Sequence, residues 1–310
     1  MKRIFLLFAA VVMAAGVASA QDINKAIEAA NSGNEAFQMG EYGLAVEAFK
    51  NSLAIAEGLG EAGAEHAATC KTAICNIYLA HAKNLIKASD FDGALAKLNE
   101  TISVAEGYGA AETVADAKEL IPNVYMAKGN ASLKAKDMAN AIAAYTKVTE
   151  INPTNGDAYL LLGRALAATG KVDEAVVAFE TAAVNGEEAA AKKQLSTLFL
   201  KKAQASLKTK NFQEVIDNAL KANSYLENAN AYKLAASASQ KLNKNTECIS
   251  FYEKYLEIKP NAKDAAGVTF TIAALYQQMG NKEKAVEYYT KVVSDPQFGP
   301  GAQEQLKVLK

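Results

Sequence analysis

The chain has 310 residues, of which half are hydrophobic, five are proline and none is tryptophan. This composition suits an all-α fold and fits neither a disordered chain nor a β-rich one. The formal net charge of −1 argues against a nucleic-acid-binding protein, because such proteins normally carry a basic face and a high isoelectric point.

Residues 1–20 have the pattern of a secretory signal peptide. Lys2 and Arg3 give a basic start, an apolar run follows, and Ala18-Ser19-Ala20 supplies the small residues of a cleavage site. We expect cleavage before Gln21, which leaves a mature formal charge of −3 from 31 basic and 34 acidic residues. The sequence therefore predicts a periplasmic or secreted protein.

An uncleaved membrane anchor is the alternative for the same segment. Its apolar run, residues 4–20, has 17 residues, which is marginal for crossing a bilayer. No later apolar run approaches that length. We therefore expect no membrane span once the signal has been removed.

The rest of the chain repeats a pattern of small and large residues. Seven small residues mark the repeats: Ala45, Ala94, Ala141, Ala175, Val215, Cys248 and Ala285. A second anchor follows each of them by four residues: Phe49, Leu98, Tyr145, Phe179, Ala219, Tyr252 and Tyr289. Another small residue precedes each by twelve: Gly33, Ala82, Gly129, Gly163, Ala203, Ala236 and Ala273. Repetition at roughly 34 residues is typical of stacked helical hairpins, in which small residues let two helices cross closely.

The first two repeats, residues 21–120, are longer than the others. They are spaced 49 and 47 residues from the repeats that follow them, and the sequence of residues 56–60 recurs in similar form at 105–109. We interpret residues 21–120 as two elongated hairpins produced by a duplication.

Five further hairpins are expected over residues 121–300. The fourth repeat of the chain has the clearest pattern, with Tyr159 and Gly163 on its first helix and Ala175 and Phe179 on its second. The spacing between the third and fourth repeats is 34 residues.

These residues resemble the tetratricopeptide repeat family, and the resemblance covers nearly all of the mature chain. It implies an α-solenoid, a right-handed superhelix of about seven antiparallel helix hairpins. Because nothing stacks on a terminal repeat, the array needs a polar cap, which we assign to a helix over residues 301–310.

The sequence offers little for catalysis or metal binding. His66 and Cys70 are four residues apart and could share a helix face that binds a metal, but no further ligands lie near them in sequence. His81 lies beside the small residue Ala82, so we expect it to pack between helices. We predict that the protein is not an enzyme and uses no cofactor or metal.

A disulfide is not expected from the three cysteines. Cys70 and Cys75 point about 140° apart around one helix, as judged from 3.6 residues per turn. Cys248 occupies one of the seven small-residue positions. All three are interpreted as small buried hydrophobic residues.

The resemblance also implies where a partner would bind. In the family, first-helix residues that are not used in packing line the concave face. The corresponding polar residues here are Asn34, Asn76, Lys83, Asn123, Asn130, Arg164, Gln204, Asn230 and Lys233, and the apolar ones are Phe37, Leu79, Met126, Leu160 and Leu200. Asparagine suits the main chain of an extended peptide, and the cations suit carboxylates.

A second column of lysines lies at the ends of the first helices: Lys87, Lys134, Lys208 and Lys241. It either attracts an acidic partner or offsets the helix dipole while remaining solvated, and the second interpretation is favoured.

The predicted function is an exported scaffold that binds a protein or peptide partner in the cell envelope. The alternative is a solute-binding protein that holds an oligosaccharide or a peptidoglycan fragment. Sugar sites usually stack rings on exposed aromatic side chains, so exposure of Phe37, Phe270 and Tyr276 would favour that alternative.

Overall fold

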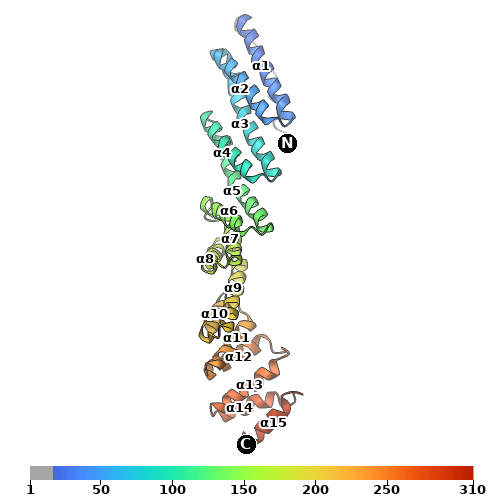
Figure 1. The fold of residues 1–310 in the computed structure, drawn as a ribbon, viewed down its shortest axis with the longest axis vertical. Coiled ribbons are helices and arrows are strands. Elements are labelled where there is room, and N and C mark those ends of the chain that lie inside the picture. The colour runs from blue at the N-terminus through green and yellow to red at the C-terminus, as the bar shows by residue number, and fades with distance from the viewer. Residues whose placement is uncertain (1–16, 310) are drawn as a thin grey trace. The chain divides into compact units, whose positions relative to one another are not determined.

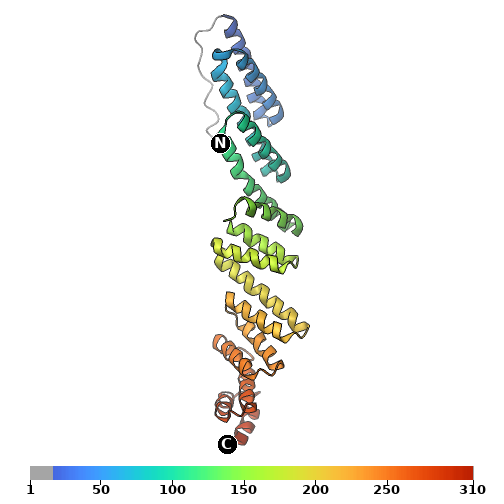
Figure 2. The same cartoon turned by 90° about the vertical axis from the view of Figure 1, so that its left-hand side faces the viewer.

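The computed structural model describes residues 17–309, and side-chain burial from residue 21 onward. The predicted signal peptide therefore lies outside the described residues, except for its last four residues, which begin the first helix. Over residues 17–309 the chain is all-α, with no strand. The paired helices of each hairpin lie side by side (Figures 1 and 2). The predicted fold class, an α-solenoid of helical hairpins, is confirmed.

One compact unit ends at Pro153, and we call it the N-terminal unit. Its helices form three hairpins: α1 (Val17–Gln38) with α2 (Tyr42–Gly58), α3 (Ala64–Lys87) with α4 (Phe91–Gly107), and α5 (Ala111–Lys134) with α6 (Met138–Ile151). A 3₁₀ turn, Gly60–Gly63, precedes α3.

The second compact unit begins at Thr154, and we call it the C-terminal unit. Its hairpins are α7 (Gly156–Ala168) with α8 (Val172–Ala182), α9 (Glu188–Lys208) with α10 (Phe212–Tyr225), α11 (Ala229–Lys241) with α12 (Asn245–Ile258), and α13 (Ala265–Gln278) with α14 (Lys282–Lys291). A π-helical turn, Ala183–Glu187, leads into α9. The final helix is α15 (Gly299–Leu309), which starts two residues before the predicted capping helix.

The repeated small residues form the packed centre of every hairpin. All seven marker residues, Ala45, Ala94, Ala141, Ala175, Val215, Cys248 and Ala285, are 0% exposed. A Cβ atom on Gly163 would come within 2.7 Å of the Phe179 ring, and one on Gly129 within 2.5 Å of the Tyr145 ring. These positions hold glycine because the second-helix ring occupies the space that a side chain would need.

Turn residues set where the helices begin and end. Asp137 and Asn155 cap α6 and α7, because their side-chain oxygens accept hydrogen bonds from backbone N–H groups in the first turn. Gly170 and Gly280 follow α7 and α13 with φ of +81° and +77°, in the left-handed region that glycine adopts without strain. These turns allow the short antiparallel return between paired helices.

The longest first helices are α3 and α5, with 24 residues each, against 13 in α7. The expected division at residue 120 falls inside α5, and the chain divides into compact units at Pro153. The two similar segments each form an ion pair with the next helix: Glu57 pairs with Lys71 at 2.8 Å, and Glu106 pairs with Lys118 at 3.4 Å.

Among helices α1 to α15 as described, none combines the length and the apolar character needed to cross a membrane.

Candidate partner-binding surface

The nine polar residues predicted to contact a partner all lie on first helices of hairpins. They are Asn34 on α1, Asn76 and Lys83 on α3, Asn123 and Asn130 on α5, Arg164 on α7, Gln204 on α9, and Asn230 and Lys233 on α11. All are exposed except Asn34, which is half-buried. Four of the exposed residues, Lys83, Asn130, Arg164 and Gln204, directly follow a buried crossing residue on their helix.

The nine residues belong to two sets. Asn34, Asn76, Lys83, Asn123 and Asn130 lie in the N-terminal unit, and Arg164, Gln204, Asn230 and Lys233 lie in the C-terminal unit. Each set is therefore a candidate surface of its own unit.

Two of the asparagines already make a hydrogen bond within the protein. The Tyr145 hydroxyl donates to Asn130 Oδ1 at 2.8 Å, and Asn123 Nδ2 donates to the Glu119 carbonyl oxygen at 3.3 Å. The Tyr145 contact holds the Asn130 amide in a fixed orientation. Its NH₂ group is left as the donor that the amide can offer to a peptide carbonyl.

Lys233 was predicted to receive a carboxylate from a partner, but it already has one within the protein. Its ammonium group forms an ion pair with Asp264, at the start of α13, and lies 5.6 Å from the centre of the Tyr255 ring. The Tyr255 hydroxyl donates to Asp264 at 2.5 Å. Hydrogen bonds from Lys233 and Tyr255 keep the pKa of Asp264 below its ordinary value of 3.8. Lys233 therefore links α11 to the next hairpin.

Lys83 and Arg164 differ from Lys233, because neither forms an ion pair among residues 21–309. Both follow directly on a crossing residue, Ala82 or Gly163. Each presents a cation to solvent that is not neutralised by its own chain.

Two of the predicted apolar contacts are corrected by the structure. Leu79 is 6% exposed and Leu160 is 4% exposed, so both are core residues rather than part of a surface. Leu79 packs in the cluster of α3, α4 and α5 that includes Leu98 and Val124. The register from the family pattern placed both on the solvent side, but the neighbouring hairpin covers Leu79.

The aromatic side chains that would suit a sugar are used in packing. Phe37 meets the edge of Tyr42 at 5.9 Å between ring centres, and Phe270 meets Tyr289 at 5.2 Å. Tyr276 lies 5.6 Å from Tyr288. Because Phe37, Phe270 and Tyr276 are all half-buried, the solute-binding alternative gains no support.

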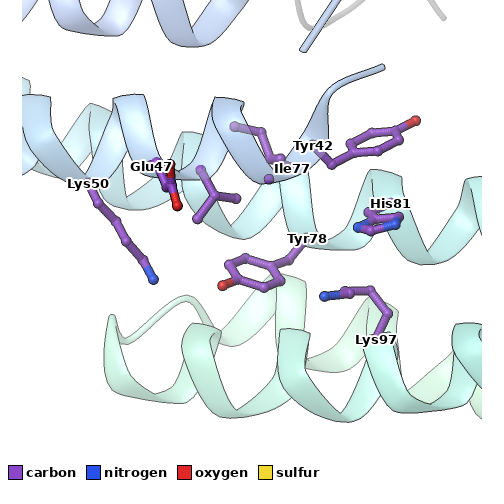
Figure 3. A pocket seen from close by; sticks show the side chains of 9 residues that line it. Tyr42, Glu47, Lys50, Ile77, Tyr78, His81 and Lys97 are labelled. Atoms are coloured by element: carbon purple, nitrogen blue, oxygen red, sulfur yellow. The ribbon is translucent and has the colours of Figure 1, made fainter. Parts of the chain in front are cut away.

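A cavity of about 250 Å³ lies between α2, α3 and α4. The His81 and Tyr42 rings stack in parallel along its wall, 4.6 Å apart, and Lys97 reaches toward the Tyr78 ring (Figure 3). Burial and nearby Lys97 lower the pKa of His81, so its imidazole is neutral at pH 7. His81 thus packs between helices as expected.

Lys97, which lines the cavity, does not offer a free positive charge to a ligand. That ammonium group pairs with Glu100 at 2.5 Å and lies 5.3 Å from the centre of the Tyr78 ring. Lys50 and Glu47 complete the charged lining with opposite signs. The charges around the cavity are balanced, so it is a weaker candidate than the first-helix surfaces.

His66 and Cys70, the candidate metal pair, both contact a buried hydroxyl. Ser52 Oγ lies 2.8 Å from His66 Nε2 and 3.2 Å from Cys70 Sγ, and it donates to the Ala26 carbonyl oxygen. Burial raises the pKa of the Cys70 thiol, which keeps it protonated. The pair lies in a packed polar contact between α1, α2 and α3.

The three cysteines are free and buried in the described chain. Cys248 lies in the core of α11, α12 and α13. Burial raises its thiol pKa to about 11. The interpretation of the cysteines as small buried hydrophobic residues is confirmed.

Comparison with known proteins identifies the repeats. Three family profiles described as Tetratricopeptide repeat match residues 79–155, residues 132–195, and residues 229–262 together with 267–294. These matches together cover more than half of the chain. A comparison with curated protein sequences finds no match.

Solved structures with a similar arrangement share little sequence with this chain. A crystal structure of the MamA protein is 21% identical and covers 60% of this chain and 94% of its own, with a TM-score of 0.35. A crystal structure of YrrB, described as a TPR protein with an unusual peptide-binding site, is 19% identical. It covers 58% of this chain and 91% of its own, with a TM-score of 0.32.

Proposed function

Because the chain belongs to the tetratricopeptide repeat family, we propose that it is an exported scaffold that binds a protein or peptide partner in the cell envelope. Repeat arrays of this kind place successive helices in register and create extended binding surfaces. The observation that carries the proposal is that each unit has exposed, polar side chains on its first helices and a fully buried packing ladder.

The binding surface rests on side chains that the fold does not need. Asn76, Lys83, Arg164 and Gln204 are exposed and contribute to neither core nor helix capping. Amide groups can pair with the main chain of a peptide, and the two cations can pair with its carboxylates. A partner would therefore be held by non-covalent polar contacts along each unit.

Export is supported by the pattern of residues 1–20 and is compatible with the packing of α1. The first buried residue in the described part of α1 is Ala26, followed by Ala30. Cleavage before Gln21 therefore keeps both of these buried residues in α1. The mass of the native protein tests this step: we expect a chain that begins at Gln21, and a full-length mass contradicts export by cleavage.

Charge reversal at the surface tests partner binding. The test variant carries Lys83→Glu and Arg164→Glu, one change in each unit. The matched control carries Lys136→Glu and Lys282→Glu, exposed cations outside the first helices that form no ion pair in the described chain. We expect the test variant to lose proteins that wild type and control retain from a native envelope extract. An unchanged set of retained proteins would show that the first-helix surface is wrongly assigned.

A further inference from the structure

Among helices α1 to α15 as described, α9 has the largest net positive charge, from five lysines and one acidic residue. Between Glu188 and Glu214 the sequence contains no acidic residue and six lysines: Lys192, Lys193, Lys201, Lys202, Lys208 and Lys210. The chain as a whole has a formal charge of −1, so this concentration is a local feature of one first helix.

Two of the helical lysines are neutralised by the protein itself. Lys192 pairs with Glu188 at 2.5 Å. Lys202 lies 4.0 Å from Asp173 and 5.7 Å from the centre of the Phe199 ring. The Lys192 pair lies within α9, whereas Lys202 reaches Asp173 on α8.

The other three helical lysines have no ion pair among residues 21–309. Lys193, Lys201 and Lys208 are exposed, and no carboxylate of the described chain lies within ion-pair distance of them. Exposed cations that lack an internal partner are available to a carboxylate from outside.

These three lysines share one face of the helix. At 100° per residue they fall within an arc of about 80°, and exposed Thr197 and Gln204 fall inside the same arc. The buried side chain of Leu195 lies on the opposite side. We call Lys193, Thr197, Lys201, Gln204 and Lys208 the α9 stripe; it extends about 22 Å along the helix.

We propose that the α9 stripe binds an extended acidic segment of a partner protein. This inference rests on the proposed scaffold function and names the chemistry of the partner. The rise of the helix separates Lys193 from Lys201 by about 12 Å and Lys201 from Lys208 by about 10 Å. An extended peptide covers those distances in three or four residues, so its carboxylates would recur at that spacing. Gln204 lies between the lysines and can bond the peptide main chain.

The residue types favour a carboxylate ligand over a nucleic acid. The stripe contains no arginine, the residue that binds phosphate with two parallel hydrogen bonds. It also contains no exposed aromatic ring on which a base could stack. Three lysines on one helix can also contact only a few phosphates of a nucleic-acid backbone, which gives weak binding. An acidic peptide needs only the point charges and the amide that the stripe supplies.

Fluorescence anisotropy with a synthetic peptide tests the proposal on the mature chain. The probe is a labelled, extended twelve-residue peptide with Glu at every third position, and its Gln counterpart is the ligand control. The test variant is K193Q/K201Q/K208Q. The matched variant, K192Q/K202Q/K210Q, removes the same charge from the same segment but outside the stripe, and circular dichroism checks that both remain helical.

We expect the stripe variant to bind the Glu peptide about tenfold more weakly than wild type, from three lost charge pairs. The matched variant should lose less than about twofold, and 0.5 M salt should abolish wild-type binding. Equal losses in the two variants, or tighter wild-type binding of the Gln peptide, would overturn the stripe.

Other anionic ligands provide a second comparison. A single-stranded oligonucleotide and phosphatidylglycerol vesicles are titrated in the same way, and tighter binding of either than of the Glu peptide contradicts the acidic-peptide assignment. If wild type ignores the Glu peptide but still retains envelope proteins through Lys83 and Arg164, the stripe inference is wrong and the scaffold function stands. If wild type neither binds the Glu peptide nor retains envelope proteins through Lys83 and Arg164, the scaffold function itself is rejected.

Discussion

The two units of this protein share a packing ladder and differ in charge. Residues 21–153 contain 11 basic and 17 acidic side chains, whereas residues 154–310 contain 20 basic and 17 acidic ones. The marker residues of both units are fully buried. The same buried ladder is therefore compatible with solvent faces of different charge. Partner choice can therefore differ between units without a change in fold.

Hairpin length is the second difference between the units. The N-terminal unit uses long helices joined by repeated Glu–Lys contacts, Glu57 with Lys71 and Glu106 with Lys118. The C-terminal unit starts with shorter helices, and its α9 carries the unneutralised lysines. The long helices give the N-terminal unit more packing area, whereas the α9 stripe gives the C-terminal unit a positively charged surface.

Removing the second anchor should have the largest effect, and an equal one in both units. Phe49→Ala in the N-terminal unit and Phe179→Ala in the C-terminal unit each remove an aromatic ring from the core. Both phenylalanines are at most 2% exposed. We expect each to lower the free energy of unfolding by about 3–5 kcal/mol, because a large cavity forms. Urea denaturation monitored by circular dichroism measures the loss. A loss below about 1 kcal/mol in either unit would contradict a shared ladder.

Filling the crossing point should have the next largest effect. In Gly129→Ala and Gly163→Ala the new methyl group meets the ring of Tyr145 or Phe179. We expect a loss of about 1–3 kcal/mol from overpacking. The control is Gly58→Ala, since no atom lies within 4 Å of a Cβ built there. Thermal unfolding should separate the control from both test variants; similar melting temperatures would show that close approach is not required.

Capping of α7 should contribute less. Asn155 Oδ1 accepts a hydrogen bond from the Ala158 N–H at 2.9 Å, whereas Lys171, before α8, provides no side-chain cap. Asn155→Ala should cost about 1 kcal/mol, and Lys171→Ala should change stability by less than about 0.5 kcal/mol. Equal changes in urea midpoint would reject the capping role.

The smallest expected effect is the pH dependence that Asp264 gives to the C-terminal unit. Hydrogen bonds lower the pKa of Asp264 below 3.8, so the folded state favours its charged form. The stabilisation is present above pH 3.8 and is lost as pH falls through the lower folded-state value. Stability of wild type relative to Asp264→Asn should therefore be constant from pH 7 to about 5 and fall in stronger acid. If the stability of wild type relative to Asp264→Asn instead rose as the pH fell, the pKa of Asp264 would be raised in the folded state and the prediction would be wrong.

The ladder could be predicted from sequence because it depends on local spacing. Gly163 and Phe179 are 16 residues apart, and their contact follows once two helices and a short turn are assigned. The burial of Leu79 could not be predicted in the same way, since the next hairpin covers it. Stacking between hairpins determines whether such residues are buried. The sequence pattern within one repeat carries no information about that stacking.

The candidate site was predicted in part for the same reason. The exposure of Lys83 and Arg164 follows from their position beside a crossing residue, whereas the ion pair of Lys233 needs Asp264, 31 residues further on. Lys193 and Lys201 were missed because the family register selects few positions on each helix. The acid-free run of residues 189–213 was the signal that could have found them.

Site-specific photo-crosslinking in cells tests the central claim most directly, namely that first-helix faces bind the partner. A photoreactive amino acid replaces exposed Gln204 on first helix α9 or exposed Asp217 on second helix α10. The account predicts a discrete crosslinked protein from position 204 and none from position 217. Crosslinking from position 217 alone, or equally from both positions, would contradict it.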